Sequence, residues 1–251
     1  MLRPMITAWI LALLIFPVAG WADSFWNLPP LPPPEEYGNI LINRTSETHG
    51  LKAVTFSHWS HRIRYTCRVC HTELAFEMKV NATEITEKAN QHGKYCGACH
   101  NGKTAFGHTK KNCNKCHNGD RSYGKEKFAK LAKFPRAKFG NKINWDKAVN
   151  EKLINPKLTI WKQAYTPLPY NKLLKLEAKW NIIPDAFFSH EIHNRWLDCS
   201  NCHPDPFNIR EKTTRHFSMK AILDGRFCGV CHRRVSFPMD DCNRCHPGIK
   251  K

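Results

Sequence analysis

Twelve cysteines and six of the histidines in this 251-residue chain share one spacing. Every cysteine belongs to a C-x-x-C pair, and a histidine directly follows each pair. The six groups are Cys67/Cys70/His71, Cys96/Cys99/His100, Cys113/Cys116/His117, Cys199/Cys202/His203, Cys228/Cys231/His232 and Cys242/Cys245/His246. Residues three apart share a face of a helical turn, so two thiols can reach two vinyl groups on one porphyrin edge while the next residue carries an imidazole under the iron. The spacing predicts six covalently attached haem c groups.

Three other uses of paired cysteines fit this chain less well. Zinc sites also use C-x-x-C pairs, but zinc leaves the histidine after every pair unexplained. Six disulfides are more than a chain of this length needs. A thioredoxin-like redox site requires one pair rather than six. Haem attachment accounts for all twelve cysteines.

The chain repeats itself with a shift of 132 residues. The shift superposes Phe56-Ser57-His58 on Phe188-Ser189-His190 and His61 on His193, and it also superposes the first two C-x-x-C-H motifs of each half. The third motifs match after a three-residue deletion. We therefore expect two trihaem units. Two histidines at the spacing of F-S-H-x-x-H more often lie on an ordinary polar surface. Here they precede predicted haem sites whose irons each need a second ligand, so we interpret them as haem ligands.

Each unit resembles the class III multihaem cytochromes c, in particular their trihaem cytochrome c7 type. The resemblance is carried by FSHWSH, CRVCH, CGACH and CNKCH in the first unit and by FSHEIH, CSNCH, CGVCH and CNRCH in the second. It implies a multihaem cytochrome fold: mainly short α-helices and irregular loops packed around covalently bound haems, with little β structure.

The resemblance also implies the second axial ligand of each iron, besides the histidine of its own motif. In that family, the two histidines of F-x-H-x-x-H serve the first and second haems. Carried over, His58 serves the haem at Cys67/Cys70, His61 that at Cys96/Cys99, His190 that at Cys199/Cys202, and His193 that at Cys228/Cys231.

The third haem of each unit is treated differently by the two halves. The family takes its distal ligand from a histidine shortly before the second motif, where His92 stands in the first unit. Asp224 occupies that position in the second unit, so the sixth haem lacks the expected ligand. We expect His216 to replace it. An open iron, or a thioether ligand from Met219 or Met239, is the alternative.

The domain organisation follows from these landmarks. Residues 1–22 read as a secretory signal, because Arg3 precedes an apolar run and small residues at the cleavage position. An uncleaved anchor is the alternative, although Pro17 interrupts the run and it is short for a bilayer. We expect a Pro-rich arm over 23–49, a trihaem domain over 50–118, a connecting segment over 119–184 and a second trihaem domain over 185–251. No stable transmembrane span remains after cleavage.

The connecting segment contains no cysteine and no histidine, so it supplies no usual haem ligand. Residues 121–180 hold fifteen Lys or Arg against four Asp or Glu, together with several aromatic side chains. Disordered segments are normally poor in aromatics. We expect one or two short helices, best placed over 172–180, with the aromatics covering porphyrin edges or, less simply, recognising a partner.

The formal net charge of +18 overstates the charge of the loaded protein. Arg3 leaves with the signal, and twelve haem propionates would bring the net charge to roughly +5 with ferrous irons or +11 with ferric irons. A nucleic-acid-binding protein is another interpretation of such a basic chain, but no recognition motif is present. We expect no nucleic-acid partner.

Iron held by two imidazoles has no free position for a substrate, and its reduction potential depends on ligands, exposure and nearby charge. The sequence therefore predicts an electron carrier of a respiratory chain in the periplasm, or secreted or at the cell surface, and not an enzyme. Its expected partners are membrane quinol-oxidising cytochromes and other multihaem cytochromes. A multihaem oxidoreductase with an open sixth iron and a self-assembling subunit of an extracellular cytochrome filament are the alternatives.

Overall fold

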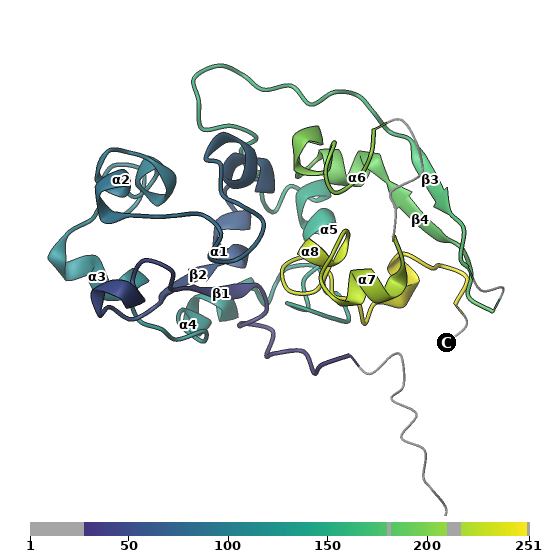
Figure 1. Cartoon of the computed structure of the whole chain (residues 1–251), viewed down its shortest axis with the longest axis horizontal. Coiled ribbons are helices and arrows are strands. Elements are labelled where there is room, and N and C mark those ends of the chain that lie inside the picture. The colour runs from purple at the N-terminus through teal and green to yellow at the C-terminus, as the bar shows by residue number, and fades with distance from the viewer. Residues whose placement is uncertain (1–27, 180–181, 210–216, 250–251) are drawn as a thin grey trace, which may run out of the picture.

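The computed structural model describes residues 28–179, 182–209 and 217–249 (Figure 1). The predicted signal segment, residues 1–22, and the predicted ligand His216 lie outside these residues.

Two antiparallel hairpins open the two repeats. Strand β1 (Asn39–Ile42) pairs with β2 (Val54–Ser57), and β3 (Leu173–Leu176) pairs with β4 (Ala186–Ser189). Asn39 lies opposite Ser57, and Leu173 lies opposite Ser189. Each second strand runs directly into a helix that begins with a histidine, α1 (His58–Arg62) or α6 (His190–Asn194). The repeat seen in the sequence is thus also a repeat of strand, strand and helix.

The prediction of a helix over residues 172–180 is wrong, because this stretch contains strand β3. Side chains along β3 alternate between exposed and partly buried, as expected for a strand with one covered face. A short apolar run such as LLKL cannot be assigned to helix or strand from its own periodicity. Pairing with β4, a contact that lies beyond the run itself, decides the outcome.

The remaining elements are short. The further α-helices of the two repeats are α2 (Glu87–Gln91), α3 (Cys113–Cys116), α7 (Met219–Leu223) and α8 (Gly229–His232). Single 3₁₀ turns cover Glu47–His49, Tyr95–Ala98, Lys110–Asn112, Cys199–Asn201 and Cys242–Arg244, and a π turn covers Val69–Glu73. Within the described residues the chain consists of short helices and loops with little β structure, as predicted.

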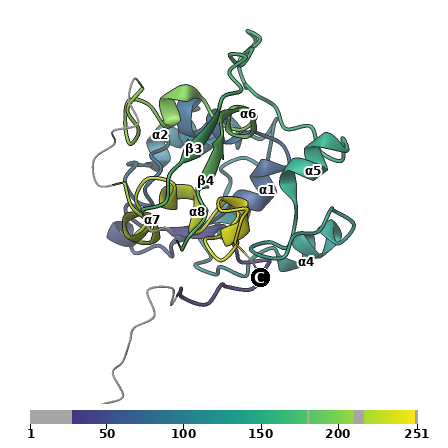
Figure 2. The same cartoon turned by 90° about the vertical axis from the view of Figure 1, so that its right-hand side faces the viewer.

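The connecting segment supplies most of the largest apolar cluster among the described residues. It forms α4 (Lys125–Phe128), a 3₁₀ turn at Ala129–Leu131 and α5 (Trp145–Asn150), which lie together on one side of the molecule (Figure 2). Buried residues of this segment pack around Trp59 of α1, with Trp196 of the second repeat at the edge of the cluster; they are Leu131, Phe134, Ile143, Ala148 and Ile154. The two repeats are therefore joined through a shared apolar cluster.

No helix among the described residues is both long enough and apolar enough to cross a membrane.

Candidate haem sites

All six C-x-x-C-H motifs lie on a helical turn or at its end. In five of them the backbone N–H of the histidine donates to the carbonyl oxygen of the first cysteine, at 2.8–3.0 Å. These pairs are His100 with Cys96, His117 with Cys113, His203 with Cys199, His232 with Cys228 and His246 with Cys242. In the remaining motif, the π turn begins at Val69, between the two cysteines. The structure thus confirms the predicted turn, which holds both thiols and the imidazole on one local scaffold.

Glycine occupies the same position in the second motif of both units. A Cβ atom on Gly97 would lie 1.8 Å from the carbonyl oxygen of Asn90 at the end of α2. A Cβ atom on Gly229 would lie 1.9 Å from the carbonyl oxygen of Ile222 in α7. The absence of a side chain therefore lets each attachment turn pack directly on the backbone of the preceding helix.

The predicted ligand histidines share one hydrogen-bond pattern. In each of the eleven that lie within the described residues, Nδ1 donates to a backbone carbonyl oxygen at 2.6–3.2 Å. The acceptors for His58, His61, His71, His92, His100 and His117 are Gly38, Ser57, Phe76, Lys88, Phe106 and Lys52, and those for His190, His193, His203, His232 and His246 are Lys172, Ser189, Phe207, Phe237 and Pro184. This bond fixes the tautomer and leaves Nε2 free as the nitrogen that can bind a metal.

Two predicted ligand pairs face each other. The ring centroids of His61 and His100 are 6.2 Å apart, and those of His193 and His232 are 6.1 Å apart. Two imidazoles that bind one metal ion through bonds of about 2 Å place their ring centroids about 6 Å apart. His61 and His193 also stack on the phenylalanine of the F-S-H segment in their own unit. The ring centroids are 4.4 Å apart for His61 and Phe56, and 4.3 Å apart for His193 and Phe188.

The other predicted pairs are less closely assembled. The charge of His71 is one cause of the lowered pKa of His58, so these two rings are electrostatic neighbours. No ring contact joins His92 to His117, or His190 to His203, in the part of the chain that the structure describes. Asp224 follows α7 as His92 follows α2, and its carboxylate pairs with Lys220 at 2.9 Å. Asp224 therefore occupies, after the helix of the second unit, the place that His92 occupies in the first unit.

One large cavity connects the two units. Its volume is about 2370 Å³, more than twice the upper end of the roughly 300–1,000 Å³ of an ordinary small-molecule pocket. It is lined by eight of the motif cysteines and six of the predicted ligands, namely Cys67, Cys70, Cys96, Cys202, Cys228, Cys231, Cys242, Cys245, His58, His61, His71, His193, His232 and His246. Apolar side chains such as Phe188 and Phe217 line it as well. The cavity has the chemistry and the size to hold several porphyrins.

The other four motif cysteines do not line this cavity, although the sequence predicts that they bind haem like the first eight. They are Cys99, Cys113, Cys116 and Cys199. Cys99 is half-buried and its side chain lies beside that of Tyr65. The pKa of Tyr65 is raised first by its burial, and then by the charge of Cys99 and a hydrogen bond between the two side chains. The carbonyl oxygen of Cys99 accepts from the backbone N–H of Ala105 at 2.9 Å. Cys99 therefore does not line the shared cavity itself but lies against Tyr65, which does, and its assignment to haem rests on the motif.

Burial sets the protonation of these groups. It lowers the pKa of His58 to about 3 and that of His232 to about 4, and it also lowers the pKa of His61, His71, His100 and His193. These imidazoles are therefore neutral at physiological pH, which is the form that binds a metal. Burial likewise raises the pKa of the Cys70, Cys96, Cys228 and Cys231 thiols to about 12. The donor set fits haem c.

Some residues that shape these sites were not predicted from the sequence. Gly38 and Lys172 each directly precede the first strand of a hairpin, and their carbonyl oxygens orient His58 and His190. Arg68 lies inside the first motif and contacts Asp198, the residue before the fourth motif. The one signal in the sequence is that these two attachment motifs carry opposite charges at or beside their first cysteine.

The sequence profile of the family described as cytochrome c7 and related cytochrome c matches residues 54–118 and 186–247. None of the curated proteins compared matches the chain. Among solved structures, the C-terminal hexahaem fragment of the dodecahaem cytochrome c GSU1996 is 26% identical, with 87% of this chain and 98% of that chain covered and a TM-score of 0.28. A c7-type three-haem cytochrome domain is 37% identical, with 36% of this chain and 94% of that domain covered and a TM-score of 0.28. The two profile matches contain all six motifs, so the predicted resemblance and the six covalently attached c-type haems are confirmed.

Proposed function

This chain belongs to the cytochrome c7 family and is an electron carrier, and we propose that it passes electrons between redox proteins of a respiratory chain outside the cytoplasm. When bound, the haems supply irons that alternate between the ferrous and ferric states. The remaining task of the polypeptide is to hold twelve thioether bonds and the axial imidazoles in fixed positions. We assign every motif cysteine to one of these bonds, including Cys99, which lies outside the shared cavity.

We assign two imidazoles to each of the first five irons. The proximal ligands are His71, His100, His117, His203, His232 and, for the sixth iron, His246. The distal ligands are His58, His61, His92, His190 and His193, in the order of the haems attached at Cys67/Cys70, Cys96/Cys99, Cys113/Cys116, Cys199/Cys202 and Cys228/Cys231. For the sixth, at Cys242/Cys245, we assign His216.

The observation that carries this assignment is the facing pair that recurs in both units. His61 with His100, and His193 with His232, stand at the separation that two imidazoles need to share one iron. Their Nδ1 atoms are engaged by backbone carbonyl groups, so only Nε2 is left to bind. An iron with both axial positions filled in this way has no site for a substrate, which favours electron transfer over catalysis.

We also propose the location and the partners. Arg3 and the apolar run that follows it within residues 1–22 support export to the periplasm, where haem attachment and the partners of such carriers are expected. Membrane quinol-oxidising cytochromes are the proposed donors and other multihaem cytochromes the proposed acceptors. Fractionation of cells that express the full chain tests the location: recovery in the periplasmic or extracellular fraction supports it, and recovery in the cytoplasm contradicts it.

A single set of measurements tests the proposed function. Purified protein is assayed for its haem-to-protein ratio, for its low-spin optical spectrum and for carbon monoxide binding in the reduced form. Six low-spin haems that do not bind carbon monoxide are expected. Carbon monoxide binding at one haem would instead favour the alternative of an oxidoreductase with one open iron, and binding at several irons would contradict the bis-histidine assignment.

A further inference from the structure

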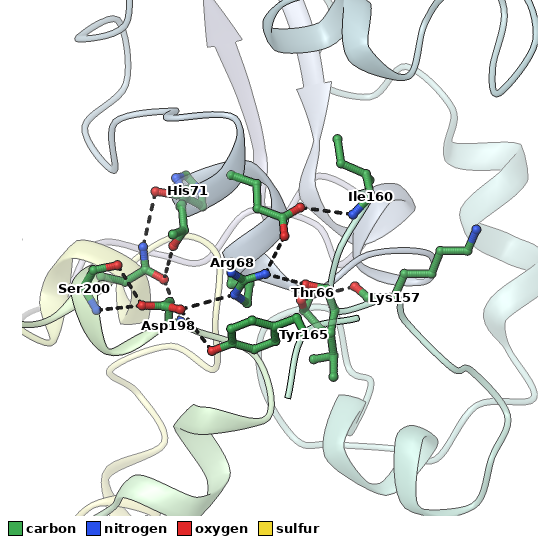
Figure 3. Close-up of polar contacts among 12 residues, drawn as sticks. Thr66, Arg68, His71, Lys157, Ile160, Tyr165, Asp198 and Ser200 are labelled. Atoms are coloured by element: carbon green, nitrogen blue, oxygen red, sulfur yellow. Dashed lines mark hydrogen bonds and ion pairs between the residues drawn. The ribbon is translucent and has the colours of Figure 1, made fainter. Parts of the chain in front are cut away.

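The first attachment motifs of the two units lie against each other (Figure 3). The side-chain amide of Asn201 donates to the backbone oxygen of His71 at 3.3 Å and accepts from the hydroxyl of Thr72 at 3.2 Å. The backbone N–H of Arg68 donates to the carbonyl oxygen of Trp196 at 2.9 Å. Residues 128 to 130 positions apart in the sequence therefore join the surroundings of the motif at 67–71 to those of the motif at 199–203.

The side chain of Arg68 lies at the centre of this contact (Figure 3). Its Nη1 pairs with Glu73 at 2.6 Å and donates to the carbonyl oxygen of Leu158 at 2.8 Å, while its Nε pairs with Asp198 at 3.3 Å. The guanidinium also lies over the ring of Tyr165, with the Cζ atom 3.4 Å from the centroid. One planar, multidentate cation thus contacts both units and the connecting segment.

The carboxylates of this cluster are held by further partners. Glu73 accepts from the backbone N–H of Ile160 at 3.0 Å, and Asp198 accepts from the hydroxyl of Tyr165 at 3.0 Å. Although burial alone would raise it, hydrogen bonds from Ser200, Tyr165 and Arg68 hold the pKa of Asp198 below its usual range. Asp198 is therefore negatively charged at physiological pH, and several bonds connect it to the rest of the cluster.

Burial distinguishes this cluster from the other ion pairs. The side chains of Arg68 and Glu73 are 9% and 5% exposed, and that of Asp198 is 22% exposed. The pair between Arg44 and Glu84, in contrast, is 45% and 68% exposed. Exposed pairs contribute little to stability, whereas loss of one partner of a buried pair leaves a charge without compensation. The Arg68 cluster can consequently fix a geometry that a surface pair cannot.

The two units also share one cavity at this contact. Cys67, Cys70, Cys202 and Cys231 line the same cavity. The cavity is therefore continuous across the contact that Arg68 organises.

We infer that electrons pass between the two trihaem units at this contact, and that Arg68 is the positioning residue that holds the first motif of one unit against the first motif of the other. The inference rests on the proposed function, because it concerns the route by which one carrier distributes electrons over its two halves. Electron tunnelling falls steeply with distance, so loosening this contact slows exchange between the units and leaves exchange within each unit intact.

The test compares Arg68→Met, Arg68→Lys, Asp198→Asn and Tyr165→Phe with the full-length wild-type protein. Arg44→Met serves as the matched control, because it removes an arginine from an exposed ion pair of the first unit. Haem content is measured first. Two-dimensional exchange NMR on partly reduced protein then reports electron exchange within and between units, and a redox titration followed by NMR reports the potential of each haem.

We expect Arg68→Met and Asp198→Asn to lose exchange between units while keeping wild-type exchange within each unit. Arg68→Lys retains the charge but not the planar fork, so it recovers part of the exchange. A purely electrostatic role predicts potential shifts of opposite sign for the loss of a cation and the loss of an anion, whereas positioning predicts slower exchange in both. Arg44→Met behaves as wild type.

Several outcomes would overturn the inference. One is wild-type exchange between units in Arg68→Met and Asp198→Asn proteins that hold six haems; another is a change confined to the potentials. If Arg68→Met does not yield protein with six haems, Asp198→Asn and Tyr165→Phe decide the question by the same readout. Failure of the proposed function looks different, because the wild type itself would then lack six low-spin haems or exchange within a unit.

Discussion

His61 and His100 face each other across a gap of 6.2 Å between ring centroids, although they lie on separate elements, helix α1 and the end of the turn at Tyr95–Ala98. His193 and His232 repeat this arrangement. Because a single mutation removes one side of such a pair, the relationship can be tested directly.

We expect His61→Gly to convert one of the six haems to a high-spin form that binds one carbon monoxide per protein, since the iron at Cys96/Cys99 loses its distal imidazole. The measurement is a carbon monoxide titration of the reduced protein, followed optically. His49→Gly is the control, because the Nδ1 atom of His49 is likewise bound to a carbonyl oxygen, that of Thr45, but the side chain is exposed. An unchanged titration in His61→Gly would show that another residue binds this iron.

Gly97→Ala should destabilise the protein by about 1–3 kcal/mol, as overpacking does, which for a domain of this size lowers Tm by roughly 2–10 °C. The reason is the 1.8 Å approach of an added Cβ atom to the backbone of Asn90, which cannot rotate away as a side chain can. Gly229→Ala repeats the test in the second unit. Asn114→Ala, at the same position of the third motif and exposed, should be close to neutral. A Tm equal to wild type for both glycine variants would contradict the packing.

The parts of the molecule that the sequence predicts are those whose chemistry is local. A thiol, a second thiol three residues later and the imidazole beside it must lie on one turn, so the motifs identify the haem sites without knowledge of the fold. The repeat then adds F-S-H-x-x-H, because His58 and His190 stand at equivalent positions. Short-range spacing therefore suffices for the attachment sites.

The parts that were missed depend on contacts between distant segments. Leu173–Leu176 forms a strand only because β4 pairs with it, and its own residues do not favour one state clearly. Arg68 occupies a position that the C-x-x-C-H motif leaves free, and the one signal for Asp198 as its partner is the opposite charge next to the first cysteine of a motif more than a hundred residues away. The placement of Cys99 against Tyr65, a residue that lines the shared cavity, is equally non-local. The spacing of residues in the sequence predicts neither the pairing of distant segments nor the contacts of the variable positions in a motif.

Removal of one haem should lower the stability of the protein more at the cavity shared by the two units than at an exposed attachment site. The double variant Cys67→Ala/Cys70→Ala removes the attachment of a haem from the cavity shared by both units, which both cysteines line. Cys113→Ala/Cys116→Ala also removes one haem, but Cys113 is exposed. We expect Tm of the first variant to lie roughly 5 °C or more below that of the second. Calorimetry on both proteins, each holding five haems, checks this, and equal melting temperatures would show that the shared cavity adds nothing.

The sixth haem provides the sharpest remaining test. His246 is buried and its Nδ1 atom donates to the carbonyl oxygen of Pro184, while Asp224 stands where the first unit has His92. We expect His216→Met to change the spectrum of one haem and to raise its potential, because a thioether replaces an imidazole. The measurement is a redox titration combined with near-infrared spectroscopy of the oxidised protein. Met239→Leu is the companion variant, since Met239 lines the same cavity as His246. A spectral change in Met239→Leu, with none in His216→Met, would assign the sixth iron to the methionine instead.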